Sequence, residues 1–279
     1  MPFMKPLATL FISLLLSVTL LGSSTQCIGI YTNDEAPDIV NTKLLPKTKE
    51  LCYSAFALMH SGISRTPLWA AEHLTRDSLR KKTKRSNDFY EEELLESDER
   101  ARLSDYSHSG FDRGHMAPSA DMPSKLAQHE CFTLANMIPQ NSDNNRGIWA
   151  AIESSTRTLA KEKGELYVIT GPLFIGSTPQ RLKDRVMIPT KIYKAIYNPV
   201  TQKGAAYLVE NTAGDHYETI SIMELEQISG IRFFPSMKPM DKQTAMKLPN
   251  PFNTAGATYH NKSTMDLPRF LQSLFKNLL

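Results

Sequence analysis

The most informative stretch of the chain reads Phe-Asp-Arg-Gly-His-Met-Ala-Pro at residues 111–118. It places a carboxylate, a guanidinium and an imidazole around Gly114, where a backbone without a Cβ atom can turn sharply and direct His115 outward. A single histidine is more often a hydrogen-bonded structural residue than a reactive one. The segments around this stretch therefore decide its interpretation.

A second polar segment follows at residues 136–153 and reads NMIPQNSDNNRGIWAAIE. Pro139 cannot lie inside a helix and Ser142 or Asp143 is a natural N-cap, so we predict a helix that begins near Asn144. At about 100° per residue, one helix face forms a core stripe of Ile148, Ile152, Ser155 and Leu159. The adjacent flank carries Asn145, Trp149, Glu153 and Arg157.

Together the two segments supply the parts needed to hydrolyse a phosphodiester. His115 ionises near neutral pH and can act as a base. Asn145 and Glu153 offer the oxygen ligands that a hard divalent cation prefers, and arginines such as Arg157 bind phosphate through paired hydrogen bonds. The alternative for the helix is an ordinary i, i+4 pair between Glu153 and Arg157, worth a few tenths of a kcal/mol, and the helix alone favours that alternative.

The combined motifs resemble the DNA/RNA non-specific endonucleases of the ββα-metal superfamily. The resemblance rests, in order, on Asp112-Arg113-Gly114-His115, Asn136-x-x-Pro139-Gln140 and Asn145-x-x-x-Trp149-x-x-x-Glu153. It covers residues 55–237. It implies an α+β fold in which a mixed or antiparallel sheet core with helices carries a ββα-metal active-site motif.

The resemblance also implies a role for each matching residue. His115 matches the general base, and Asn145 matches the only direct protein ligand of a Mg²⁺ ion whose other ligands are waters. Glu153 matches the acid that holds a metal-bound water. Asn136 matches a residue that supports the site beside the histidine, and Arg157 matches an arginine that contacts phosphate near the transition state.

A further phosphate-binding arginine is expected in the basic run at residues 80–85. Arg85 is our choice, with Lys84 and Arg80 as alternatives. The residues Asp112, Arg113 and Gly114 are expected to fix the turn and the imidazole. Mn²⁺ is expected to substitute for Mg²⁺, and no small-molecule cofactor is expected.

The composition is that of a folded protein with a small charge excess. The chain has 279 residues, 41% of them hydrophobic, and a net charge of +3, which excludes disordered, collagen-like and coiled-coil classes. No linker divides it, so we predict one α+β domain with extensions. The boundaries are a signal peptide at 1–24, an N-terminal extension at 25–54, the endonuclease domain at 55–237 and a C-terminal extension at 238–279.

The first 24 residues have the layout of a secretory signal peptide. They contain no acidic residue, one lysine and an apolar stretch from Leu7 to Gly22, which is shorter than the roughly 20 residues that a membrane span requires. We expect cleavage near residues 23–25, a secreted or periplasmic protein, and no stable membrane insertion afterwards. In that setting Cys27 and Cys52 are expected to form a disulfide, and Cys131 is expected to be a buried thiol.

The remaining secondary structure follows from residue periodicity. Strands are predicted at residues 165–170, 191–197 and 204–210, with Gly171-Pro172 closing the first. Helices are predicted at residues 51–60, at residues 220–228 with a stop at Gly230, and at residues 267–278, where an amphipathic segment is expected to dock on the core. The charged run at residues 76–100 is expected to be solvated.

The function predicted from these features is a secreted endonuclease that cleaves DNA and RNA without base recognition. Arginines and lysines that contact phosphate carry no sequence information, and no base-reading motif is present. Two alternatives remain: a nucleic-acid binding protein that has lost catalysis, and a phosphodiesterase of the same fold for small substrates. Homodimerisation remains open.

Overall fold

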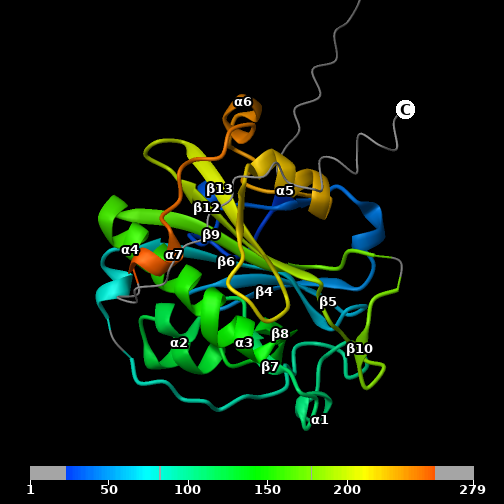
Figure 1. Cartoon of the computed structure of the whole chain (residues 1–279). Helices are drawn as coiled ribbons and strands as arrows, with labels where there is room; N and C mark the ends of the chain where they lie inside the picture. The colour runs from blue at the N-terminus through cyan, green and yellow to red at the C-terminus, as the bar shows by residue number, and fades with distance from the viewer. Residues whose placement is uncertain (1–22, 82, 177, 255–279) are drawn as a thin grey trace, which may run out of the picture.

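The computed structural model describes residues 23–81, 83–176 and 178–254, and its centre is an antiparallel sheet of seven strands (Figure 1). The predicted α+β class with an antiparallel sheet core is confirmed. In spatial order the strands are β14 (Glu218–Ile220), β13 (Lys203–Glu210), β12 (Lys191–Asn198), β9 (Glu165–Leu173), β6 (Thr66–Thr75), β5 (Ala57–Ser61) and β4 (Thr48–Cys52). The segment at residues 25–54 thus contributes an edge strand to the main sheet.

Three of these strands confirm the predicted ones, with one difference at an end. Strands β9, β12 and β13 contain the predicted ranges, but β9 continues through Gly171 and Pro172 to Leu173. A Cβ atom on Gly171 would lie 2.4 Å from the carbonyl oxygen of Leu68 on β6. This glycine therefore permits close packing of neighbouring strands and does not end the strand.

The prediction of a helix at residues 51–60 is wrong, because these residues form the β4–β5 hairpin. Leu51 pairs with Leu58 across the hairpin, and the backbone N–H of Tyr53 donates to the carbonyl of Phe56. Strand β5 is buried on both faces, so apolar and polar residues do not alternate along it. A short apolar run of this kind cannot be assigned to helix or strand by periodicity alone.

The two faces of the sheet are covered by different elements (Figure 1). One face carries the β7–β8 hairpin, α2 (Lys125–Glu130), α3 (Ser142–Asn144) and α4 (Ala150–Lys163). The other carries α5 (Ile222–Ser229) and the small β3–β15 pair. Strand β6 contributes to both cores, since Ala70 and Leu74 pack on the α4 side and Trp69 and Ala71 on the α5 side.

Helix α5 confirms the predicted helix at residues 220–228. It begins after Ser221, whose side chain caps the backbone N–H of Glu224, while Glu224 bonds back to Ser221. This reciprocal arrangement is a capping box. The helix ends at Gly230, which adopts the left-handed conformation with φ of 69° that favours glycine.

The remaining elements are short. The strands are β1 (Ser23–Ser24), β2 (Glu35–Ala36), β3 (Asp38–Ile39), β7 (Asp112–His115), β8 (Met137–Gln140), β10 (Arg181–Leu182), β11 (Val186–Met187) and β15 (Ile231–Arg232). The short helices are α1 (Leu103–Tyr106), α6 (Pro239–Lys242), α7 (Pro251–Thr254), η1 (Thr32–Asp34), η2 (Thr42–Leu44), η3 (Ser78–Arg80), η4 (Ser119–Asp121), η5 (Leu134–Asn136) and η6 (Asn145–Trp149).

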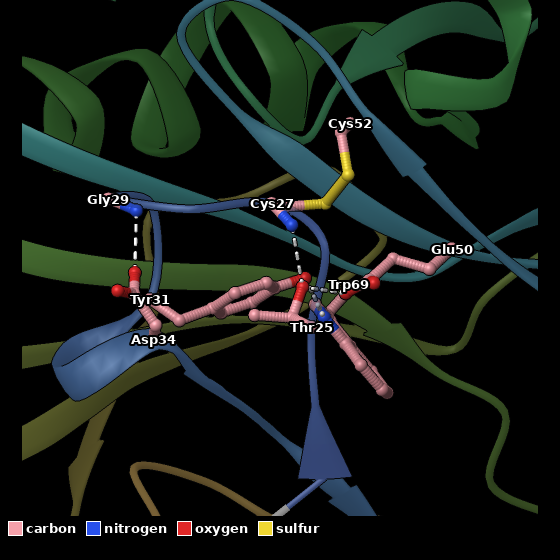
Figure 2. The surroundings of a disulfide bond; sticks show 8 residues. All are labelled: Thr25, Cys27, Gly29, Tyr31, Asp34, Glu50, Cys52 and Trp69. Atoms are coloured by element: carbon pink, nitrogen blue, oxygen red, sulfur yellow. Dashed lines mark hydrogen bonds between the residues drawn. A yellow bond between two sulfur atoms is a disulfide. The ribbon is translucent and has the colours of Figure 1, made fainter.

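The predicted disulfide between Cys27 and Cys52 is present and ties the N-terminal segment to the edge strand β4 (Figure 2). Two further contacts hold the same segment. The hydroxyl of Thr25 donates to Glu50 at 2.8 Å, and the indole N–H of Trp69 donates to the hydroxyl of Tyr31 at 3.3 Å. The N-terminal segment is therefore packed against the α5 side of the sheet.

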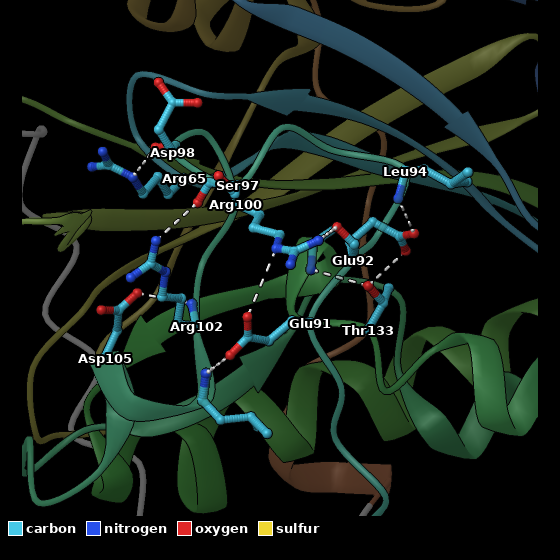
Figure 3. Close-up of polar contacts among 12 residues, drawn as sticks. Arg65, Glu91, Glu92, Leu94, Ser97, Asp98, Arg100, Arg102, Asp105 and Thr133 are labelled. Atoms are coloured by element: carbon cyan, nitrogen blue, oxygen red, sulfur yellow. Dashed lines mark hydrogen bonds and ion pairs between the residues drawn. The ribbon is translucent and has the colours of Figure 1, made fainter.

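The charged run at residues 76–100 is only partly solvated (Figure 3). Glu92 is buried and accepts hydrogen bonds from the hydroxyls of Tyr53 and Thr133. It thereby joins the β4–β5 turn to the segment that precedes β8. Glu91 and Arg100, whose side chains are partly exposed, form a long ion pair of 3.7 Å beside it.

Some predicted features lie outside the described residues. Of the predicted signal peptide the structure describes Ser23 and Ser24, and the amphipathic segment at residues 267–278 and Lys82 are not among the described residues. Within the described part of the chain, no helix has the length and apolar character needed to cross a bilayer.

Candidate active site

Strands β7 and β8 form a short antiparallel hairpin that carries the first motif. His115 pairs with Met137, and Gly114 pairs with Ile138. Gly114 lies in the extended strand, so the expected sharp turn at this position is wrong. A Cβ atom there would lie 2.0 Å from Oε1 of Gln140, and the glycine is required by this close approach.

Asn136 fixes the backbone that follows His115. It is fully buried at the end of η5, immediately before β8. Its side-chain oxygen accepts from the N–H of Ala117 at 2.9 Å, and its side-chain nitrogen donates to the carbonyls of Ala117 and Cys131 at 2.9 and 3.0 Å. All three contacts are to backbone atoms, so Asn136 holds the chain at Ala117, two residues after His115.

The helix after β8 begins earlier than predicted. Asn141, and not Ser142 or Asp143, is the N-cap, because its side-chain oxygen accepts from the N–H groups of Asp143 and Asn144, both at 3.1 Å. Helix α3 then passes through the π-turn η6 into α4. Within the π-turn, Gly147 has φ of −101° and ψ of −108°, outside the helical region.

The π-turn changes which residues share a helix face. The predicted core stripe is confirmed, since Ile148, Ile152, Ser155 and Leu159 are buried. The predicted polar flank is only partly correct. Asn145 and Glu153 line one cavity, whereas Trp149 between them is fully buried and faces Lys194 on β12.

The cavity that these residues share has a volume of about 410 Å³. It is bounded by the β7–β8 hairpin, by the start of α4 and by the loop that carries Arg85. Its lining residues are Arg85, Phe89, Asp112, Arg113, His115, Pro118, Ser119, Ala120, Asn145, Arg146, Ala150 and Glu153. The structure therefore brings together six of the residues singled out in the sequence: Arg85, Asp112, Arg113, His115, Asn145 and Glu153.

His115 is 7% exposed, and its ring accepts or donates no hydrogen bond among the described residues; its Nε2 atom is fully buried. The ring packs edge-on against Phe132, with centroids 4.9 Å apart. Burial, assisted by the nearby charge of Arg85, lowers the pKa of His115 to about 3. The imidazole is consequently neutral at pH 7.

Asn145 is oriented by Asp112. The side-chain nitrogen of Asn145 donates to Oδ2 of Asp112 at 2.9 Å, and the side-chain oxygen of Asn145 has no hydrogen-bond partner in the described part of the chain. Because the nitrogen is held by Asp112, the oxygen is left for a cation. This hydrogen bond connects η6, which precedes α4, with β7, and so joins the two motifs.

Glu153 lies in the cavity wall and Arg157 lies one turn further along α4. Burial raises the pKa of Glu153 to about 7, although Lys194 and Arg157 act in the opposite direction. Arg157 does not line the cavity. It pairs at 3.0 Å with Asp121, a buried residue of η4 that the sequence reasoning missed. Arg157 thus pairs with a residue of η4 and not with Glu153, its partner in the alternative interpretation of the helix.

The prediction from the sequence also missed two further buried charged residues. Glu72 on β6 is 1% exposed and its carboxylate has no hydrogen-bond partner, and burial raises its pKa well above the usual value. Lys194 donates to the hydroxyl of Thr170 at 2.7 Å. A charged residue inside an otherwise apolar strand is the signal that could have identified both, whereas nothing in the loop sequence marks Asp121.

Among the described basic residues at 80–85, Arg85 lines the cavity. Its guanidinium lies 5.1 Å from the ring centre of Phe132 and its Nε atom donates to Asn87 at 2.7 Å. Arg80 pairs with Asp77 instead. The geometry therefore favours Arg85 over Arg80 as the phosphate-binding residue of this run.

The donor set fits a hard divalent cation. Asn145 offers a free amide oxygen, and Glu153 offers a carboxylate that accepts no hydrogen bond among the described residues. In the described residues, the cluster of His, Cys, Asp and Glu ligand atoms close enough to bind a metal is Cys27, Glu50 and Cys52, and there the disulfide occupies both sulfurs. An oxygen-ligated ion at the cavity is thus the better-supported metal site.

The chain matches the model of the family described as DNA/RNA non-specific endonuclease over residues 37–240. Nuclease C1 of Cunninghamella echinulata var. echinulata is 35% identical over 205 residues, which cover 66% of this chain and 81% of that protein. The mitochondrial nuclease EXOG of Danio rerio is 34% identical over 212 residues, which cover 67% of this chain and 61% of EXOG.

A solved structure gives the same assignment. The structure described as the EndoG/EndoGI complex, on the mechanism of EndoG inhibition, is similar with a TM-score of 0.64 and 27% identity, covering 70% of this chain and 89% of that chain. The family match extends over the hairpin, the helix and the cavity described above. The chain therefore belongs to the DNA/RNA non-specific endonuclease family, as an enzyme that hydrolyses phosphodiester bonds.

Proposed function

We propose that this chain is a secreted endonuclease that hydrolyses both DNA and RNA, with one Mg²⁺ ion and with His115 as the general base. The observation that supports this most directly is the environment of His115. A buried imidazole without a hydrogen-bond partner is unusual for a structural histidine, and this one lines the same cavity as Asn145 and Glu153.

In the proposed reaction, the neutral imidazole of His115 takes a proton from the water that attacks phosphorus. A new P–O bond forms, and the bond to one ester oxygen of the chain breaks. Asn145, with Glu153 through a water, would hold the ion, whose chemistry is neutralisation of charge on the phosphate and leaving oxygen. Arg85, which lines the same cavity, would bind the same phosphate.

Broad substrate choice is part of the proposal. The cavity wall contains arginines that suit phosphate, which DNA and RNA share, and contacts of this type carry no base information. We expect cleavage of supercoiled plasmid and of RNA, and loss of both activities in EDTA.

The central test compares the wild type with His115→Ala on both substrates. Loss of a general base is expected to reduce kcat by at least about 100-fold. His73→Ala is a matched control, because His73 lies outside the cavity, stacked on Tyr167. Equal cleavage by His115→Ala and wild type would disprove the assigned base, and binding without cleavage by the wild type would favour the inactive binding protein.

Secretion rests on the sequence of the first 24 residues. Expression with the full leader in a secreting host should release a chain that begins near residues 23–25, which intact-mass spectrometry of the purified protein would measure. A protein that retains Met1 and stays with the cells would contradict this part of the proposal.

A further inference from the structure

Arg146 is a cavity-lining arginine to which neither the motifs nor the proposed mechanism gives a role. Its Nε atom donates to Oδ2 of Asp112 at 3.0 Å and its Nη2 atom donates to Oδ1 at 2.7 Å. The guanidinium is thus held in a bidentate arrangement by a residue of β7. The side chain of Arg146 is nevertheless 74% exposed, so it lies at the mouth of the cavity.

The contribution of the Arg146–Asp112 ion pair to the stability of the fold is too small to explain its bidentate geometry. An ion pair with one partner this exposed contributes little to the free energy of unfolding, and often nothing measurable. A bidentate pair does fix the direction of a guanidinium, which otherwise samples many rotamers. The third nitrogen of Arg146, Nη1, has no hydrogen-bond partner among the described residues. The pair therefore presents an oriented donor to the solvent.

The size of the cavity determines what this donor would meet. About 410 Å³ is enough for one small ligand, so a polymer whose scissile phosphate enters the cavity must continue across its rim. Arg85 and Arg113 are stacked on the rings of Phe132 and Phe89, at 5.1 and 4.2 Å from their centres. Arg146 has no such ring contact among the described residues.

We propose that Arg146 is a substrate-binding residue that contacts a backbone phosphate next to the scissile one, and that Asp112 is the positioning residue for its guanidinium. This inference rests on the proposed function, because it assigns a contact to the same nucleic-acid substrate. Asp112 then has two tasks, since it also holds the nitrogen of Asn145.

The first experiment measures binding without cleavage. Fluorescence anisotropy in EDTA would follow a labelled 12-nucleotide single strand at several NaCl concentrations, for the wild type, Arg146→Ala and Lys47→Ala. Loss of one phosphate contact should reduce the slope of log Kd against log salt by about 0.7 and weaken binding about tenfold. Lys47 is a matched control, because it is an exposed, ion-paired cation outside the cavity.

The second experiment separates a substrate contact from an effect on the reacting groups. Bis(4-nitrophenyl) phosphate has a single phosphate and cannot reach a neighbouring site, so Arg146→Ala should hydrolyse it within twofold of the wild type. Arg146→Lys should keep the salt slope on the polymer, since it keeps the charge, while binding remains weaker than in the wild type.

Two results would overturn the inference: an unchanged salt slope in Arg146→Ala, or a loss on the small diester as large as the loss on the polymer. The second would mean that Arg146 acts through Asp112 on Asn145. Failure of the proposed function would look different, because the wild type would then cleave neither substrate while the salt slopes in EDTA would still report on the Arg146 contact.

Discussion

Three histidines of this chain occupy different environments, and hydrogen bonding distinguishes them. His60 is buried and its Nε2 atom bonds to the carbonyl of Glu99 at 2.9 Å. His73 stacks on Tyr167 and bonds to Glu165. His115 is buried without a partner for its ring among the described residues. A buried polar group without a partner costs free energy, so its retention at the cavity is best explained by a reaction.

The structural role of His60 predicts a pH-dependent stability. Burial lowers the pKa of His60 from 6.5 to about 4. Between these two values the unfolded chain binds a proton that the folded chain does not, so the free energy of unfolding falls as the pH falls from 6.5 to 4. The part due to His60 is on the order of 3 kcal/mol.

Urea unfolding of the wild type and His60→Gln at pH 7 and pH 4 would measure this effect. The glutamine amide can still donate to Glu99 but does not titrate, so His60→Gln should lose less stability between the two pH values than the wild type. His73→Gln is the same exchange at a less buried histidine and controls for the exchange itself. Identical losses in all three proteins would contradict the prediction.

Gly114 gives a second prediction at the scale of a single residue. In Gly114→Ala the new Cβ would meet Gln140 at 2.0 Å from Oε1 and 2.6 Å from Cβ. Because Gln140 is fully buried and bonded to Asn144, it cannot move away easily. We expect a loss of about 2 kcal/mol in the free energy of unfolding, measured by urea denaturation.

A Gln140→Gly background removes the side chain that the new Cβ atom at position 114 would meet. There, Gly114→Ala should cost less than about 1 kcal/mol, because overpacking is relieved. An equal cost in both backgrounds would show that backbone strain, and not contact with Gln140, requires the glycine.

At the scale of secondary structure, the active site depends on how β7, β8 and α4 are joined. The hairpin contributes His115 to the cavity wall, the π-turn η6 contributes Asn145, and α4 contributes Glu153. Asn136 secures the hairpin through three hydrogen bonds to backbone atoms. The geometry of the site therefore rests on a residue that does not line the cavity.

Asn136→Ala should for this reason lower activity as well as stability. Loss of three buried hydrogen bonds is expected to reduce the free energy of unfolding by about 3 kcal/mol. Without these bonds the backbone after His115 is no longer held, and a misplaced catalytic group loses transition-state stabilisation. At temperatures below the melting temperature, kcat on plasmid should therefore fall at least about tenfold, with a smaller change in KM.

Asn198→Ala is the control for this prediction. Asn198 is also buried, and its side chain accepts from the N–H groups of Val200 and Thr201 in the β12–β13 turn, away from the cavity. It should be destabilised with an unchanged kcat. A similar loss of kcat in both variants would indicate general destabilisation rather than positioning of His115.

At the scale of the whole molecule, the disulfide and the active site lie on different sides of the sheet. The Cys27 segment packs with the core on the α5 side, whereas the cavity is built on the α4 side. Stability and catalysis should therefore respond separately to loss of this bond.

The Cys27→Ser/Cys52→Ser variant is expected to lose about 3 kcal/mol, because the bond closes a loop with a sequence separation of 25. For a protein of this size that corresponds to a Tm roughly 6–12 °C lower by differential scanning calorimetry. At 25 °C its kcat should equal that of the wild type. A Tm change of less than about 2 °C, or an inactive but folded variant, would contradict this view.

Cys131, the cysteine outside the disulfide, provides the control for the Cys27→Ser/Cys52→Ser variant. Cys131 is buried, its thiol donates to the carbonyl of Gln128, and burial raises its pKa to about 12. Cys131→Ser should leave the disulfide intact. Thiol titration of the native wild type is accordingly expected to find no reactive cysteine, as predicted for a buried thiol.

The family motifs, three central strands, helix α5 and the pairing of Cys27 with Cys52 were predictable from the amino-acid sequence. The strands and the helix are local features, since strand patterns, a capping residue and a glycine stop act over a few residues, and the motif residues keep their order along the chain. The edge hairpin β4–β5 was misassigned for the opposite reason. A strand buried on both faces has no alternating pattern, and its neighbours in the sheet decide its conformation.

The details of the site depend on contacts between distant segments and were not predictable in this way. Trp149 lies in the π-turn and does not share the cavity with Asn145 and Glu153. Arg157 pairs with Asp121 and not with Glu153. The close approach of Gln140 explains why residue 114 is a glycine. Glu72, Asp121 and Lys194 come from three segments far apart in sequence, and the packing that buries Glu72 raises the pKa of its carboxyl group. Contacts between distant segments depend on packing, and no local pattern encodes them.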